Sequence, residues 1–150
     1  VTFHLGNVEA RVMHKPSAHT DGDAIIHFPK ANVIHTGDLL FHAIFPFIDM
    51  DNGGSVDGYL AAQKEILAMA DDNTKIIPGH GALTDKAGLQ SDIDMLVRSR
   101  QLVQALIDEG MSVDELVVAN PLAEFESFSW SFVTTERMTR ALYRSLTTEQ

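Results

Sequence analysis

The sequence predicts one α/β domain in which helices flank a mixed sheet. At 150 residues the chain is long enough for one domain with a hydrophobic core. Hydrophobic residues make up 45% of it and charged residues 21%, which is typical of a globular protein. Strand-like runs interrupted by polar motifs come first, and helical patterns follow from residue 86. This order predicts a layered α/β arrangement.

The first half of the chain predicts five short strands. Residues 2–5 and 8–14 form two runs of β-formers around the turn Gly6-Asn7, which predicts a hairpin. Further strands are expected at 24–28, 33–35 and 74–77, each followed by turn residues. The segment 39–48 is rich in Phe and Leu but has no clean period and contains Pro46, so we expect a loop there.

Four helices are predicted, and all but the first lie in the second half of the chain. The first spans 58–70 after a possible Ser55 cap, and a long one spans 86–109 and stops at Gly110. A short helix opens at Ser112 and ends before Asn120-Pro121. An aromatic loop at 123–131 holds the only Trp, and a last helix runs from a Thr134 or Thr135 cap to about residue 146.

Composition excludes several classes of function. The formal net charge is −10, from 21 acidic and 11 basic residues without a basic run, so nucleic acid is not an expected partner. No apolar run approaches the length of a membrane span. There is no cysteine, so any metal ligands would be His and carboxylates. Because the chain begins Val-Thr-Phe-His in strand-like alternation, we expect it to be a piece of a longer protein.

Three short motifs place His or Asp residues where strands are expected to end. They occupy residues 18–23, 34–38 and 77–81, and their candidate ligands are His19, Asp38 and His80. Each motif alone is an ordinary turn. Together they predict ligands that converge on one edge of the sheet, and His with Asp suits Zn²⁺ or a similar ion.

These motifs resemble the later metal motifs of the metallo-β-lactamase superfamily: His19-Thr20-Asp21-Gly22-Asp23, His35-Thr36-Gly37-Asp38 and Pro78-Gly79-His80-Gly81. The segments 45–49 and 53–58 resemble one branch of metallohydrolases in it, and the likeness covers nearly the whole chain. It implies that residues 1–150 are a partial domain, the C-terminal half of a four-layer αββα sandwich, which includes a helical part at 86–150.

The resemblance also implies roles for individual residues. His19 would complete a three-histidine site for a first metal, Asp38 would bridge two metals as the catalytic carboxylate, and His80 would bind the second metal. The complete protein would then hold two Zn²⁺ ions and hydrolyse an ester, thioester, lactone or amide bond in a small-molecule substrate. Asp rather than Cys at position 38 resembles the glyoxalase II and lactonase-like branches. Asp21 and Asp23 would form turns or support the ligands.

The chain departs from the family pattern at its most specific motif, because His-x-His-x-Asp-His is absent. Five other histidines lack its spacing: His4, His14, His27, His35 and His42. The first four of these are interpreted as structural or surface residues. The missing N-terminal half, or else a second chain, would have to supply the other ligands, and we expect the former. The piece alone should bind zinc at low occupancy and be inactive. The alternative is a non-catalytic scaffold or interaction module.

An exposed half-sandwich face would also favour a homo-oligomer or a strand-exchanged dimer. The sequence leaves localisation unknown, although members of this branch are often exported.

Three further features have two interpretations each. Residues 49–53 hint at a calcium loop, but its twelfth position is Leu60, so a turn is expected. Three arginines share one helix face and could attract an anion, although a solvated face paired with local carboxylates is the expected reading: Arg137, Arg140 and Arg144. Four aromatic residues could line a pocket, although packing is expected: Phe125, Phe128, Trp130 and Phe132.

Overall fold

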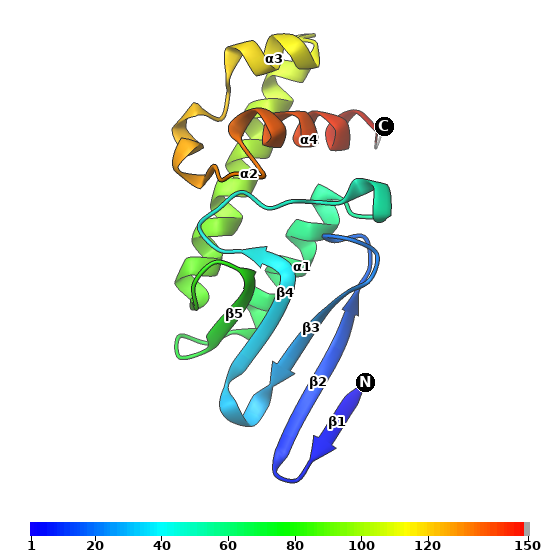
Figure 1. Cartoon of the computed structure of the whole chain (residues 1–150), viewed down its shortest axis with the longest axis vertical. Helices are drawn as coiled ribbons and strands as arrows, with labels where there is room; N and C mark the ends of the chain where they lie inside the picture. Colours follow the sequence, from blue (N-terminus) through cyan, green and yellow to red (C-terminus); the bar gives the residue numbers. More distant parts are fainter. Residues whose placement is uncertain (149–150) are drawn as a thin grey trace.

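A computed structural model describes residues 1–148, which form a mixed five-stranded sheet with flanking helices (Figure 1). The strands lie side by side in chain order, the first three pairings are antiparallel, and the fourth is parallel. The predicted α/β class is therefore confirmed. The strands are β1 (Thr2–Leu5), β2 (Val8–Lys15), β3 (Asp23–Phe28), β4 (Val33–Phe41) and β5 (Lys75–His80).

Four α-helices complete the fold. Helix α1 (Val56–Met69) connects β4 to β5 and packs against β4, as expected for the crossover between parallel strands. Helix α2 (Lys86–Asp108) packs against α1 and α4 (Thr135–Thr148), and α4 also contacts α3 (Val113–Ala119). Short 3₁₀ turns occur at Pro29–Ala31, Met50–Asn52 and Ala123–Phe128. Among the described residues, no helix is both long and apolar enough to cross a bilayer.

The predicted helix caps are present. The Ser55 hydroxyl accepts a hydrogen bond from the amide of Gly58 at 2.9 Å. Ser112 forms a reciprocal capping box with Glu115 at the start of α3. Thr134 accepts from the amide of Arg137 at 3.3 Å before α4. Local sequence therefore determines where these helices begin.

Strand β4 is longer than predicted. It was expected to end at His35, but it continues through Asp38 to Phe41, so residues 39–41 are not loop. Its pairing with β5 shifts register on both sides of Gly37, which has a φ of +52°. Gly37 adopts a left-handed conformation and forms a β-bulge. The bulge allows the strand to continue beyond His35, where it was predicted to end. β5 likewise extends to His80 instead of ending at Ile77.

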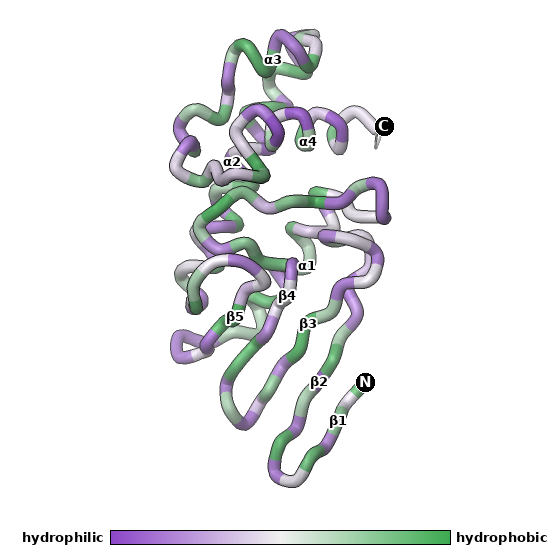
Figure 2. Tube along the Cα trace, viewed as in Figure 1, coloured by the Kyte–Doolittle hydropathy of each residue, from purple (hydrophilic) through white to green (hydrophobic). Residues whose placement is uncertain are grey.

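The two faces of the sheet differ in burial. Ile25, Ile34 and Ile76 lie on one face and are fully buried in the core. The other face is also apolar, yet none of its hydrophobic side chains is buried, and apolar residues continue along β1 and β2 toward the hairpin tip (Figure 2). These residues are Phe3, Leu5, Val8, Val12, Ile26, Phe28, Val33 and Ile77.

Candidate metal centre

The structure brings the three residues singled out in the motifs together. The Asp38 carboxylate lies between two imidazoles: Oδ2 is 3.5 Å from Nε2 of His19, and Oδ1 is 3.5 Å from Nε2 of His80. The side chain of Asp38 is 41% exposed, that of His80 is 47% exposed and that of His19 is 13% exposed. The three side chains therefore form a cluster that solvent and a ligand can reach.

His19 lies in the loop between β2 and β3, and residues 49–55 hold this loop in place. The His19 carbonyl accepts from the amide of Asp49 at 2.8 Å, and the Ala18 carbonyl accepts from the amide of Ser55 at 3.0 Å. A Cβ on Gly54 would lie 2.2 Å from the His19 carbonyl oxygen, so the two segments can approach this closely only with glycine there. His19 is thus fixed through its backbone.

The ring of His19 is oriented by a second contact. Its Nδ1 lies 2.7 Å from the carbonyl oxygen of Phe47, which can only accept, so Nδ1 donates. In the neutral ring, Nε2 then carries a lone pair that faces an oxygen of Asp38. A cation between His19 Nε2 and Asp38 Oδ2, which lie 3.5 Å apart, would be attracted by both. A hydrogen bond from Nδ1 to a backbone carbonyl is typical of histidines that bind a metal through Nε2.

His80 is positioned by aromatic packing. Its ring stacks on that of Phe41, with centroids 4.4 Å apart and an interplanar angle of 14°. This contact follows from register, because Phe41 and His80 are paired across β4 and β5. The ring centroid of Trp130 lies 6.0 Å from that of His80, and Trp130 Nε1 donates to the carbonyl of Phe45 at 2.9 Å.

Gly79 leaves the space that the Asp38 carboxylate occupies. A Cβ there would lie 2.2 Å from Oδ1 of Asp38 and 2.7 Å from the carbonyl of Gly37. Any side chain at this position would displace either the carboxylate or strand β4.

The cluster has a donor arrangement that can be compared with the needs of two metal ions. The two Asp38 oxygens face different histidines, so each of two cations would find one imidazole and one oxygen of a shared carboxylate. Within residues 1–148, no group of three or more His, Asp or Glu side chains is arranged to hold a metal ion. The donor types fit zinc or a similar cation, whereas their number leaves at least two tetrahedral positions per ion to other ligands.

A buried carboxylate supports the loop that follows β4. Asp92 on α2 is buried, and its oxygens accept from Nδ1 of His42 at 2.7 Å and from the amide of Ala43 at 3.0 Å. Ala43 has a φ of +59°, which is strained for a residue with a side chain. Burial raises the pKa of the Asp92 carboxyl, and the hydrogen bonds from His42 and Ala43 oppose this rise.

The other histidines and the early aspartates lie outside the cluster. His14 contacts the carbonyl of Asp21, and His35 accepts from the amide of Gly37. Asp23 accepts from the amide of Thr20 at 2.6 Å, so its expected turn-forming role is present.

Sequence reasoning missed three contributors to the site. These are the Phe41 ring, which stacks on His80, the Phe47 carbonyl, which accepts from His19, and the Asp92 carboxylate, which binds the loop after β4. The apolar run Leu39-Leu40-Phe41 was a signal that β4 continues and carries Phe41 to His80. The contacts of Phe47 and Asp92 join residues 28 and 50 positions apart, and no local pattern indicates them.

Comparison with known sequences gives partial matches only. No family model matches the chain. A stretch of 81 residues, 53% of the chain, is 35% identical to an uncharacterised protein of Mycobacterium leprae and covers 36% of that protein. An uncharacterised protein of Mycobacterium tuberculosis is 32% identical over 85 residues, which cover 53% of the chain and 37% of that protein. The matched stretch thus spans little more than a third of these relatives.

Solved structures share the fold. A stereoselective inverting sec-alkylsulfatase from Pseudomonas sp. superposes on 96% of the chain with a TM-score of 0.72 at 16% identity, and the match covers 25% of that enzyme. A metallo-β-lactamase from Pontibacter korlensis superposes on 65% of the chain and 45% of its own, with a TM-score of 0.54 and 17% identity. The B3 metallo-β-lactamase BLEG-1 gives 0.53 at 27% identity over 63% of the chain and 44% of its own. The sheet and its flanking helices therefore have the fold of these hydrolases over the shared part.

Proposed function

We propose that this chain is the C-terminal half of a metal-dependent hydrolase of the metallo-β-lactamase superfamily. In the complete protein, His19, Asp38 and His80 would bind two divalent cations, with zinc as the expected metal. One observation carries the proposal: a single carboxylate presents one oxygen to each of two imidazole nitrogens at 3.5 Å. The fold shared with β-lactamases and a sulfatase, all of them hydrolases, supports it.

Each residue of the cluster has a separate task in this proposal. Asp38 would offer one carboxylate oxygen to each of the two cations. His19 and His80 would orient them, with their rings held by Phe47 and Phe41. Cations bound here would activate water as a nucleophile and stabilise negative charge on an ester, thioester, lactone or amide substrate.

The test is metal content and activity measured together in the complete protein. Asp38→Ala and His80→Ala should each abolish hydrolysis and remove at least one equivalent of metal, because each substitution removes a ligand. His4→Ala is the matched control, because His4 is exposed in the β1–β2 hairpin, away from the cluster. Metal would be counted by mass spectrometry of the purified variants. Retention of full metal and activity in both cluster variants would refute the proposal.

A non-catalytic scaffold is the second candidate, and the lack of a three-ligand group among residues 1–148 is compatible with both functions. The two functions differ in what precedes Val1 in the gene. A His-x-His-x-Asp-His motif there would supply the remaining ligands and support the hydrolase, whereas its absence would support the scaffold.

A further inference from the structure

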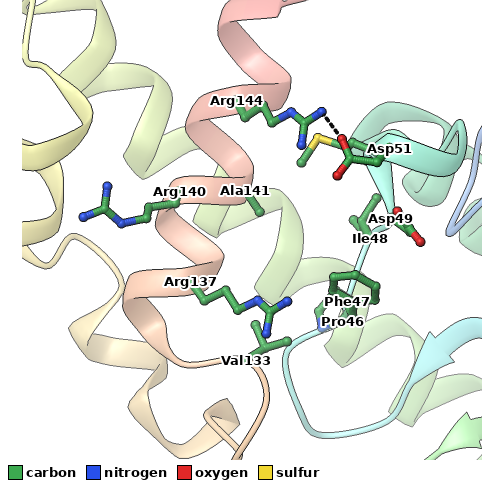
Figure 3. Close-up of a pocket in the computed structure, with 11 residues that line it drawn as sticks. Pro46, Phe47, Ile48, Asp49, Asp51, Val133, Arg137, Arg140, Ala141 and Arg144 are labelled. Carbon is green, nitrogen blue, oxygen red and sulfur yellow. Dashed lines mark hydrogen bonds and ion pairs between the residues drawn. The ribbon is translucent and has the colours of Figure 1, made fainter.

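A cavity of about 300 Å³ lies next to the candidate metal centre, between α4 and residues 46–51 (Figure 3). Its walls are largely apolar and include Pro46, Phe47, Ile48, Val133 and Ala141. Three arginines of α4 also line it. For each arginine, the structure shows whether it is paired with a local carboxylate or remains free to attract an anion.

Two of the three arginines are paired with carboxylates, as expected for a solvated face. Arg140 contacts Glu136 and Asp114, and in Figure 3 it points away from the 46–51 segment. Arg144 reaches across to that segment and binds Asp51 at 2.5 Å. An ion pair therefore occupies the end of the cavity near Arg144.

Arg137 differs from every other arginine of the chain. Each of the other five lies within ion-pair distance of a carboxylate, whereas Arg137 has no such partner within residues 1–148. In a chain with a net charge of −10 and carboxylates in excess, an unpaired guanidinium is unexpected. Its charge remains available to a ligand.

The Arg137 guanidinium is also held in position. It lies 3.8 Å from the centroid of Phe132 and 5.2 Å from that of Phe47, and Nη1 donates to the carbonyl of Phe132 at 2.8 Å. Stacking leaves the edge of the guanidinium plane available for hydrogen bonds, and several N–H groups have no partner among the described residues. A planar fork of this kind binds a carboxylate through two parallel hydrogen bonds.

Phe47 links this cavity to the metal-ligand cluster. Its ring packs edge-on against those of His19, at 5.9 Å, and Phe132, at 5.1 Å, and its carbonyl holds His19. A molecule in the cavity would therefore contact the residue that positions a proposed metal ligand. Asp49 and Asp51 lie at the other end, where Asn52 and Arg144 bind them, so an anion is favoured at the Arg137 end.

We propose that this cavity binds a carboxylate of the substrate, with Arg137 forming the paired hydrogen bonds and the apolar walls covering the adjoining hydrocarbon chain. The inference rests on the proposed hydrolase and names its substrate class: esters or related acyl compounds with a carboxylate remote from the bond that is cleaved.

The experiment compares two esters that differ only in the remote carboxylate, mono-para-nitrophenyl adipate and para-nitrophenyl hexanoate. The metal-loaded complete protein should prefer the adipate in kcat/KM. Arg137→Met should lower this preference by about tenfold or more, mainly through KM, because the charged hydrogen bonds are lost. Arg140→Met is the matched control on the same helix and should leave the preference unchanged. Ala141→Phe, which fills the cavity and keeps Arg137, should lower it as well.

A binding measurement separates this inference from the hydrolase proposal. Monomethyl adipate, titrated calorimetrically into the metal-free complete protein, should bind saturably to the natural protein and to Arg140→Met, and not to Arg137→Met or Ala141→Phe. If neither ester is hydrolysed but this binding pattern holds, the carboxylate site stands, and hydrolysis of this class of ester is refuted. If monomethyl adipate does not bind the natural protein, or if folded Arg137→Met retains both binding and preference, the carboxylate site is refuted.

Discussion

At the scale of single residues, the geometry of Asp38 depends on a neighbour without a side chain. Gly79 faces the carboxylate across the β4–β5 pair, in the position where a Cβ would overlap Oδ1. The motif Pro-Gly-His-Gly therefore has two roles: His80 supplies an imidazole, and Gly79 leaves the space that the Asp38 carboxylate occupies.

Gly79→Ala is expected to disrupt the cluster. Its Cβ would lie 2.2 Å from Asp38 Oδ1, so the substitution should displace the carboxylate and destabilise the fold by about 1–3 kcal/mol. Gly22→Ala is the control, because its Cβ would meet only Thr20 Oγ1 at 3.8 Å. Urea unfolding would measure stability, and cobalt binding by absorbance in the complete protein would measure the site. A Gly79→Ala protein as stable and as cobalt-competent as Gly22→Ala would contradict this reading.

Single residues were predictable where the signal is local. Ser55, Ser112 and Thr134 precede their helices with the spacing that caps require, and each makes its bond. His42 and Asp92 show the opposite case. Their contact spans 50 residues and depends on how α2 packs against the end of β4, so nothing near either residue in the sequence indicates it.

At the scale of elements, Asp92 joins α2 to the segment that leaves β4. Its carboxylate accepts hydrogen bonds from two consecutive residues, and the second, Ala43, has a left-handed backbone. The segment then continues through Phe45, which receives the Trp130 N–H, to Phe47, which orients His19. Helix α2 thus contributes to the position of a proposed ligand that lies far from it in sequence.

Asp92→Ala should therefore lower stability more than an equivalent change elsewhere on α2. It leaves the N–H of Ala43 and Nδ1 of His42 without acceptors in a largely buried place, which should cost about 2 kcal/mol or more. Asp94→Ala, two residues along, removes only an exposed bond from Gln90 and should change stability little. The free energy of unfolding in urea compares the two, and equal values would show that Asp92 does not anchor this segment.

The element boundaries show why the strands were underestimated. Thr36-Gly37-Asp38 has the composition of a turn, and a turn there was a reasonable prediction. In the fold, pairing with β5 on one side and burial of Leu39 and Leu40 outweigh this local preference, and Gly37 takes up the mismatch as a bulge. Tertiary pairing of this kind cannot be read from a short window of sequence.

At the scale of the whole molecule, the sheet has one covered face and one uncovered apolar face. The order of strands and helices along the chain was sufficient to predict the α/β class. It was not sufficient to predict the aromatic contacts around the cluster, because Phe41, Phe47 and the pair Trp130 and Phe132 come from three separate segments. The uncovered face carries Phe3 at 60% and Leu5 at 82% exposure, and such a face favours association.

The 150-residue chain by itself is expected to dimerise through this face at micromolar concentration. A second copy is the covering layer available to it, and burying the apolar residues would drive association. Leu5→Lys should shift the molecule to a monomer, because it places a charge on the face. Val118→Lys is the control, because Val118 is 86% exposed on α3, outside the sheet. Light scattering coupled to size exclusion measures the mass, and a monomeric natural chain would count against this expectation.

The shared carboxylate has a thermodynamic consequence for the proposed dinuclear site. Asp38 lies beside both histidines, so the two proposed metal positions would not be independent: the orientation of this one carboxylate would affect binding at both. By reciprocity, whatever free energy the first ion contributes to binding of the second, the second contributes to the first. Binding of the two ions would then be coupled, and the coupling free energy would combine the shared carboxylate with the repulsion between the ions.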